Sequence, residues 1–220
     1  MCGRFALTVD PADLQEAFPA YTFPAQSAPR FNISPTQPVL VLPNDGTNKA
    51  DYFVWGLIPS WAKAPSIGSR MINARAETLA EKPSFRAALK YRRCIIFADG
   101  FFEWQPGAKT KVPHFIRLKS GKPFAFAGLW EHWQSPDGSE VKSATIITTG
   151  PNALMATIHN RMPVILSASS YARWLDPSPA TPSDLKNLLV PYPADEMEAY
   201  PVSTLVNSPA NDLPELILPA

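Results

Sequence analysis

The sequence predicts a β-rich protein in which an antiparallel meander or barrel carries a few short helices. Proline supplies 25 of the 220 residues, against a usual share of about 5%. Because proline removes a donor and clashes inside a helix, such a chain cannot consist mainly of long helices. Five short apolar runs lie between residues 94 and 148, separated by turn signals such as Asp99-Gly100 and Ser120-Gly121. Short strands at this spacing are typical of antiparallel sheets and barrels.

The N-terminal half predicts strands alternating with loops and two short helices. One helix spans 11–18, because Asp10 can cap it and proline is favoured at its first position. A second short helix covers 84–91 and is entered through Pro83. We expect strands at 3–9, 39–42 and 51–56, with loops at 21–35 and 57–69.

The C-terminal half predicts the main sheet, followed by helices and a tail. No internal repeat and no long linker divides the chain, so we expect one domain covering residues 1–220. A proline-rich, acidic tail at about 191–220 is expected to pack on it. The predicted strands are 94–98, 101–104, 114–118, 124–130 and 143–148, and the predicted helices are 151–158, 168–175 and 181–189.

Composition excludes several classes of protein. Two cysteines are too few for a disulfide framework or a cysteine-based zinc ribbon, and no HExxH motif or carboxylate cluster is present, so we expect neither a metal nor a cofactor. No apolar run approaches the roughly 18 residues of a membrane span, and the N-terminus does not read as a secretion signal. We therefore expect a cytoplasmic monomer.

The formal net charge of +1 conceals an uneven distribution. Residues 60–95 carry eight basic and two acidic side chains, whereas residues 175–220 carry one basic and seven acidic side chains. A basic segment in a neutral protein favours a local site for a polyanion, although it is also compatible with a solvated face whose charges pair elsewhere. The acidic tail is expected to lie away from any such polyanion.

Cys2 directly follows the initiator methionine. Removal of Met1 would leave an N-terminal cysteine, whose α-amine and thiol have ordinary pKa values of about 7.7–8.0 and about 8.5. Such a 1,2-aminothiol condenses with an aldehyde to a Schiff base, which the thiol then closes to a thiazolidine. N-terminal nucleophiles that use their own amine as a base are a known catalytic arrangement. A tolerated cysteine without function is the alternative.

Three polar residues in apolar surroundings, Glu103, His159 and Asn73, are candidates for acid–base or anchoring roles, and Arg75 lies close to the last of them. Glu103 stands among aromatic residues on a predicted strand, where desolvation would let it carry a proton near neutral pH. His159 is matched to proton transfer at neutral pH. Asn73 and Arg75 share one face of an extended segment and could hold a hydroxyl or carbonyl and a phosphate. A buried ion pair, a structural histidine and a turn asparagine are the respective alternatives.

Seven sequence motifs follow one another along the chain: MCGRF, RFNISP, WGLIPSW, NARAET, KPSFR, RRCIIFADGFFEW and IHNRMPVIL. In this order they resemble the motifs of one family, the SOS response-associated peptidase (SRAP) domain. The resemblance runs from residue 2 to about residue 205. It implies an α+β domain with a curved antiparallel, barrel-like β core and flanking short helices.

The resemblance implies a sensor and shield of abasic sites in single-stranded DNA that forms a thiazolidine cross-link through Cys2 after self-removal of Met1, with possible lyase activity. Asn73 would contact the opened sugar, and Glu103 and His159 would handle protons. The implied DNA-binding residues are Arg4, Arg75 and Arg161 at phosphates, Trp61 and the loop from Asn32 to Pro35 along the strand, and Lys82, near which some relatives carry an arginine.

Two other functions stay open. A thiol peptidase or amidase could use Cys2, His159 and Glu103 as nucleophile, base and orienting group, and would need only the thiol. A non-covalent module that binds single-stranded DNA would need neither the thiol nor the amine.

Overall fold

The computed structural model describes residues 2–135 and 137–220. Its centre is a closed five-stranded barrel in which β10 pairs with β4, β4 with β3, β3 with β6, β6 with β9, and β9 again with β10. These strands are β3 (Pro38–Pro43), β4 (Asp51–Trp55), β6 (Arg93–Ala98), β9 (Phe124–Gln134) and β10 (Glu140–Thr149). The expected barrel-like core and the α+β class are confirmed.

One contact in the barrel differs from the expected antiparallel pattern. β10 runs parallel to β4, with Ser143 opposite Val54, and also parallel to β5 (Asn73–Arg75). The sheet is therefore mixed, because β4 reaches β10 through a crossover rather than a hairpin. Two short strands, β11 (Met162–Pro163) and β12 (Ile165–Leu166), pair with β10 and β9.

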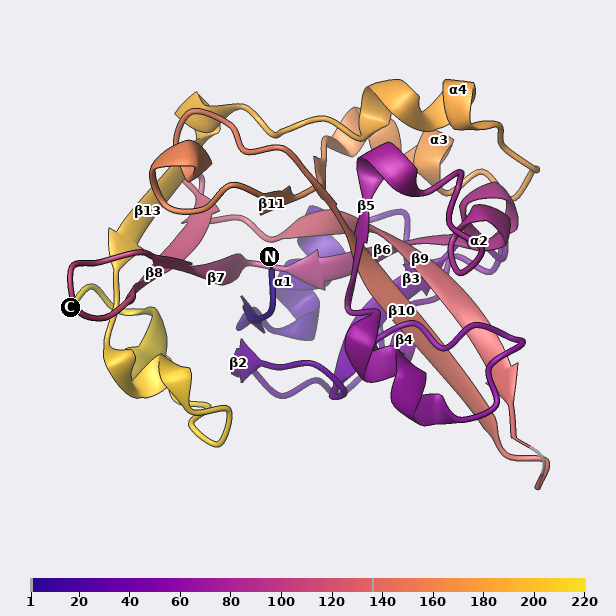
Figure 1. Cartoon of the computed structure of the whole chain (residues 1–220), viewed down its shortest axis with the longest axis horizontal. Coiled ribbons are helices and arrows are strands. Elements are labelled where there is room, and N and C mark those ends of the chain that lie inside the picture. The colour runs from indigo at the N-terminus through magenta and orange to yellow at the C-terminus, as the bar shows by residue number, and fades with distance from the viewer. Residues whose placement is uncertain (1, 136) are drawn as a thin grey trace.

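A second, five-stranded antiparallel sheet lies beside the barrel in the order β13, β8, β7, β1, β2. Figure 1 shows β13, β8 and β7 on one side of the molecule and the long β9–β10 hairpin extending from the other. The strands are β1 (Phe5–Leu7), β2 (Arg30–Ile33), β7 (Gly100–Gln105), β8 (Val112–Leu118) and β13 (Met197–Pro201). The prediction missed β2, which lies in the expected loop 21–35, and β13, which lies in the expected tail.

The helices are short, as the proline content predicts. Helix α1 (Pro11–Ala17) begins after Asp10, whose carboxylate accepts from the N–H groups of Ala12 and Asp13. The prediction at 151–158 is wrong, because that segment holds turns and only a 3₁₀ turn at Met155–Thr157. The other α-helices are α2 (Arg86–Tyr91), α3 (Tyr171–Trp174) and α4 (Pro182–Leu185).

The short strand β1 is held firmly at its C-terminal end. The Asp99 carboxylate accepts from the backbone N–H of Thr8 at 2.6 Å, from its hydroxyl at 2.5 Å, and from the N–H of Val9 at 3.2 Å. Gly100 lies opposite Ala6, where a Cβ atom would stand 2.0 Å from the Phe115 ring. These contacts set the register of β1 against β7, and therefore the position of the N-terminal residues before it.

Candidate functional site

Cys2 is brought to Glu103 by the pairing of β1 with β7. Phe5 lies opposite Phe101, and the N–H of Phe102 donates to the carbonyl of Arg4 at 2.9 Å. Continuing this antiparallel pairing towards the N-terminus places Gly3 opposite Glu103 and Cys2 one residue further along, and the Glu103 carboxylate is close enough to act electrostatically on the Cys2 thiol. The two residues are 101 positions apart in the chain, so only the sheet brings them together.

The Cys2 thiol is completely buried. Burial raises the pKa of this thiol, and the nearby Glu103 carboxylate raises it further, because both disfavour the thiolate. A backbone hydrogen bond from Arg4 opposes these effects in part. The thiol is therefore neutral near pH 7, and a reaction at sulfur needs a group that accepts its proton.

Asn73 lies at the start of β5 and reaches the backbone of Cys2. Parallel pairing of β5 with β10 places Asn73 opposite Ile146, and its Nδ2 donates to the Cys2 carbonyl at 2.8 Å. The Asn73 Oδ1 atom is buried and has no hydrogen-bond partner in the described part of the chain. It can therefore accept a hydrogen bond from a group that enters beside Cys2.

Glu103 and His159 come from separate segments that are tied together. Glu103 is only 3% exposed on β7. Two residues along the same strand, Gln105 Nε2 donates to the Thr157 carbonyl at 2.7 Å, which attaches the turn before His159 to β7. The His159 Nδ1 atom lies 3.1 Å from the Arg161 backbone nitrogen, which donates to it. His159 lines an open cleft of about 570 Å³ together with Trp104 and Lys111.

The three predicted phosphate-binding arginines have different surroundings. Arg75 is exposed. Arg161 forms a salt bridge to Glu77 at 2.6 Å. The Arg4 guanidinium donates through Nη1 to Asn32 Oδ1 at 2.7 Å and to the Val206 carbonyl at 2.8 Å. Arg75 is thus directly accessible, whereas Arg4 and Arg161 already have protein partners.

Asn32, which the resemblance places along the path of DNA, is held by the C-terminal segment. Asn32 is only 1% exposed, and its Nδ2 donates to the carbonyls of Ser208 and Asn211 at 3.1 and 2.6 Å. Asp212 in turn accepts from the N–H groups of Phe31 and Asn32 at 2.5 and 3.0 Å. Asn32 therefore holds the C-terminal segment against β2. Pro35, three residues on, is partly exposed beside this segment.

The acidic tail is expected to lie away from a bound polyanion, yet it contacts two residues close to Cys2 and Glu103. Its Val206 carbonyl contacts Arg4, and its Asn207 Oδ1 accepts from Trp104 Nε1 at 2.7 Å. The Arg4 guanidinium carbon lies 5.9 Å from the centre of the Trp104 ring. The tail thus holds Arg4 and Trp104, which closely follow Cys2 and Glu103 in the chain.

Trp61 and Lys82 are both exposed, but they lie in different loops. Trp61 is 59% exposed and lines an open cavity of about 540 Å³ with Lys63 and Arg70. An exposed aromatic ring beside basic side chains suits stacking on an unpaired base. Lys82 lies on the turn that leads to α2.

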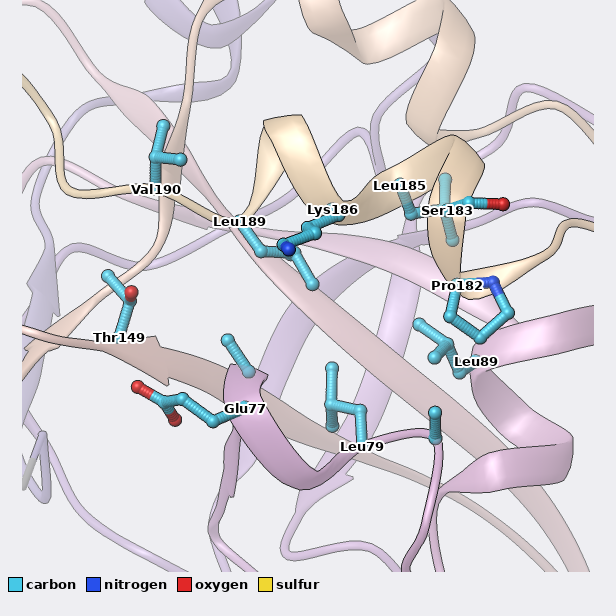
Figure 2. A pocket seen from close by; sticks show the side chains of 12 residues that line it. Glu77, Leu79, Leu89, Thr149, Pro182, Ser183, Leu185, Lys186, Leu189 and Val190 are labelled. Atoms are coloured by element: carbon cyan, nitrogen blue, oxygen red, sulfur yellow. The ribbon is translucent and has the colours of Figure 1, made fainter.

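A separate apolar pocket of about 390 Å³ lies between the segment that follows β5 (residues 76–80) and α4 (Figure 2). Leucines from three segments line it, together with Lys186 and Glu77. Neither Cys2 nor Glu103 contributes to it, so it is distinct from the site of the predicted chemistry. Its connection to that site is Glu77, the partner of Arg161.

Two further features bear on the type of site. Among residues 2–135 and 137–220, no cluster of three or more histidine, cysteine or acidic residues is arranged to hold a metal ion. No helix in this part of the chain combines the length and apolarity of a membrane span.

Sequence reasoning missed Glu77, Gln105 and the Val206–Asn207 segment. Glu77 lies within the NARAET motif, two residues after Arg75, and that spacing is the one signal that could have drawn attention to it. Nothing in the sequence indicates that Gln105 attaches the turn before His159, or that Val206 receives Arg4. Those contacts join segments that are far apart in the chain.

The arrangement can carry out carbonyl chemistry at the N-terminus. It combines a neutral thiol, a carboxylate whose charge acts on it, and an asparagine that fixes its backbone. With Met1 removed, an amine and a thiol on one residue would share this enclosed space with a proton carrier. Such a pair reacts with aldehydes, and exposed side chains such as Arg75 and Trp61 suit a nucleic-acid ligand.

The chain is similar in sequence and in fold to known proteins. The chain is 52% identical to the abasic site processing protein YoqW of Bacillus subtilis, over 99% of both chains. It is 33% identical to the abasic site processing protein HMCES of Xenopus tropicalis, over 98% of this chain and 77% of that one. A crystal structure of a Bacteroides thetaiotaomicron protein matches all of both chains with a TM-score of 0.89 and 27% identity. The family model of the SOS response associated peptidase matches residues 1–209. The chain belongs to the SRAP family.

Proposed function

We propose that this protein senses abasic sites in single-stranded DNA and shields them by forming a covalent cross-link through Cys2. The observation that carries the proposal is the enclosure of an N-terminal cysteine by Glu103 and Asn73. An abasic deoxyribose opens to an aldehyde, which is the natural partner of a 1,2-aminothiol. The naming of relatives at 52% and 33% identity as abasic site processing proteins supports the same substrate.

The chemistry proceeds in two steps after Met1 has been removed. The Cys2 amine attacks the aldehyde carbon, and the resulting carbinolamine loses one water to give an imine. The thiol sulfur then adds to the imine carbon while its proton moves to the imine nitrogen, which closes a five-membered thiazolidine ring. The second step is favoured by a high effective concentration, because both nucleophiles belong to one residue.

The surrounding residues would have separate roles. Glu103 and His159 would carry protons during carbinolamine dehydration, ring closure and reversal. Asn73 Oδ1 would accept from a hydroxyl of the opened sugar. Arg75 would hold a flanking phosphate directly, and Arg4 and Arg161 would do so while retaining protein contacts. Trp61, Pro35 and Lys82 would guide the strand on either side.

We also propose that Met1 leaves by self-cleavage, a hydrolysis that consumes one water and that Glu103 assists. The test is to purify the Glu103→Gln protein and measure its intact mass alongside the parent from a host lacking methionine aminopeptidase activity on Met-Cys. Retention of Met1 in the variant alone supports self-cleavage, and its loss in both excludes a role for Glu103.

Strand cleavage beside the lesion would be a minor lyase reaction of the imine. The proposed working form is a monomer in the cytoplasm.

The decisive test mixes the purified protein with a single-stranded oligonucleotide that contains one abasic site. Denaturing electrophoresis and intact mass should show one product, equal to the Met-less protein plus the DNA minus one water. The same oligonucleotide with a tetrahydrofuran in place of the lesion is the control, because it has no aldehyde. A folded protein that has lost Met1 and still gives no adduct would overturn the proposal.

In protein from which Met1 has already been removed, Glu103→Gln should slow adduct formation about 100-fold, in line with the usual contribution of a general acid or base. Glutamine keeps the shape of the side chain but cannot exchange a proton, so the affinity for intact single-stranded DNA should not change. Quench-flow or manual time courses measure the rate, and anisotropy measures the affinity. Equal rates of formation and reversal in variant and parent would remove Glu103 from the mechanism.

Arg75→Ala should weaken binding to intact and abasic single strands by the same factor. Loss of one phosphate contact should also reduce the slope of log K against log salt by about 0.7. Anisotropy titrations at several salt concentrations measure both quantities, with Lys119→Ala as a control outside the basic segment. An effect confined to the abasic strand would contradict a phosphate contact.

A further inference from the structure

The Arg161 side chain is almost fully occupied by protein groups. Its Nη1 donates to Glu77 Oε1 at 2.6 Å and its Nη2 to Glu77 Oε2 at 3.0 Å. Nη2 also donates to the carbonyl and the hydroxyl of Thr148 at 2.6 and 3.2 Å. A two-pronged ion pair with added backbone contacts is geometrically specific, unlike most surface ion pairs. Arg161 is therefore held in one orientation.

The same residue also orients the imidazole of His159. The backbone N–H of Arg161 donates to His159 Nδ1 at 3.1 Å. The same Nδ1 atom lies 3.3 Å from the Arg161 carbonyl oxygen, so the backbone of Arg161 contacts the ring at two points. Fixing the Arg161 side chain thus also fixes the short turn that presents His159.

Glu77 belongs to the segment that carries Asn73. Strand β5 ends at Arg75, which lies opposite Thr148 of β10, and Glu77 follows in the next 3₁₀ turn. In Figure 2 the Glu77 carboxylate lies on the Thr149 side of the apolar pocket, while Leu79 points into the pocket. The Glu77–Arg161 pair therefore fastens the Asn73 segment to the His159 turn, across 84 residues of sequence.

The Glu77–Arg161 ion pair is partly shielded from water and stays charged at neutral pH. Arg161 is 16% exposed and Glu77 is 53% exposed, so one partner is largely shielded from water. The hydrogen bond from Arg161 is the largest of the influences that lower the pKa of Glu77. Glu77 is consequently ionised throughout the neutral range, and the pair is lost only under acid conditions as the pH falls through this lowered pKa.

We propose that Glu77 is a positioning residue for the cross-linking reaction, and that it acts through Arg161 to align His159 with Asn73 beside Cys2. This inference rests on the proposed function. It also explains why Arg161, which is proposed to contact DNA, is paired with the Glu77 carboxylate. The pair holds the Arg161 side chain in one orientation.

The test is a single-turnover measurement of adduct formation over a range of DNA concentrations. It uses the Met-less parent, Glu77→Ala and Glu77→Gln. Glu77→Ala should lower the limiting rate roughly tenfold, since small misplacements of reacting groups are costly. The half-saturating DNA concentration should stay within about twofold. Glu77→Gln keeps one acceptor oxygen for Arg161 and should recover part of the rate. Affinity for intact single strands should be unchanged or tighter, because a negative charge is removed.

Two controls make the result specific. Glu198→Ala breaks a salt bridge of the same length, 2.6 Å to Arg117 on β8, and should leave the rate unchanged. In an Arg161→Ala background, adding Glu77→Ala should have no further effect, because the glutamate acts through the arginine. An unchanged limiting rate in Glu77→Ala, or a loss seen only in the half-saturating concentration, would overturn the inference. Failure of the parent itself to form an adduct would instead overturn the proposed function.

Discussion

Cys2→Ser should abolish the adduct that survives denaturation, with a loss of at least about 100-fold. Serine leaves the α-amine in place after removal of Met1, so the imine can still form, but the hydroxyl is a poor nucleophile and cannot close the durable ring. Borohydride should therefore trap the variant on abasic DNA as a reduced secondary amine. Denaturing electrophoresis with and without borohydride measures both outcomes.

The same variant separates the three candidate functions. Without thiol or hydroxyl, Cys2→Ala should behave like the serine variant, and both should keep the parent's affinity for intact single-stranded DNA. Intact mass must first show that Met1 is absent from every variant. A denaturation-resistant adduct formed by Cys2→Ser would contradict the thiazolidine. Absence of any adduct from the parent, together with equal binding by all variants, would favour the non-covalent module.

Arg93→Met should destabilise the fold by at least about 3 kcal/mol. Arg93 is completely buried at the start of β6. Its guanidinium donates to five backbone carbonyls, those of Leu89, Lys90, Trp174, Asp176 and Ser178. Methionine fills similar space but removes the guanidinium donors. The Lys90 carbonyl keeps the Ala180 N–H at 3.1 Å, and each buried carbonyl that is left unpaired is costly. Denaturant unfolding followed by fluorescence measures the change.

The matched control is Arg86→Met, on the exposed face of α2. It makes the same chemical change where water replaces the guanidinium, so its effect should stay within about 0.5 kcal/mol. Equal stabilities of the two variants would show that the Arg93 hydrogen bonds contribute little beyond solvent. Because Arg93 joins β6 to the segment after α3, its loss should also loosen the barrel at that end.

Local sequence signals predicted most strands of the fold. The apolar runs from residue 94 to 148 became β6, β7, β8, β9 and β10, with ends within a few residues except in the long β9–β10 hairpin. Alternation, turn pairs and helix caps act over neighbouring residues, so they are legible in the chain. β2 escaped because its short run follows a proline-rich loop. The helix expected at 151–158 does not form, because the apolar residues of this segment pack into the core from a series of turns.

The candidate site divides in the same way. The chemistry of Cys2 as an N-terminal aminothiol follows from its place in the chain, and the motifs around Asn73, Glu103 and His159 marked these residues as a set. Their mutual placement depends on the β1–β7 register and on the parallel pairing of β5 with β10. Neither pairing has a local signal, because each joins segments more than 70 residues apart.

By itself, the sequence determined the family and most strand positions and indicated Cys2 as the candidate reactive group, because these depend on residue identity and on neighbours a few places away. Tertiary structure alone decided that Asn32 is buried under the C-terminal segment and that Arg161 is held by Glu77. It also decided that the barrel closes through a parallel contact of β10 with β4. These outcomes follow from burial and hydrogen-bond satisfaction across the whole chain, where a polar group takes whichever partner the fold brings within reach.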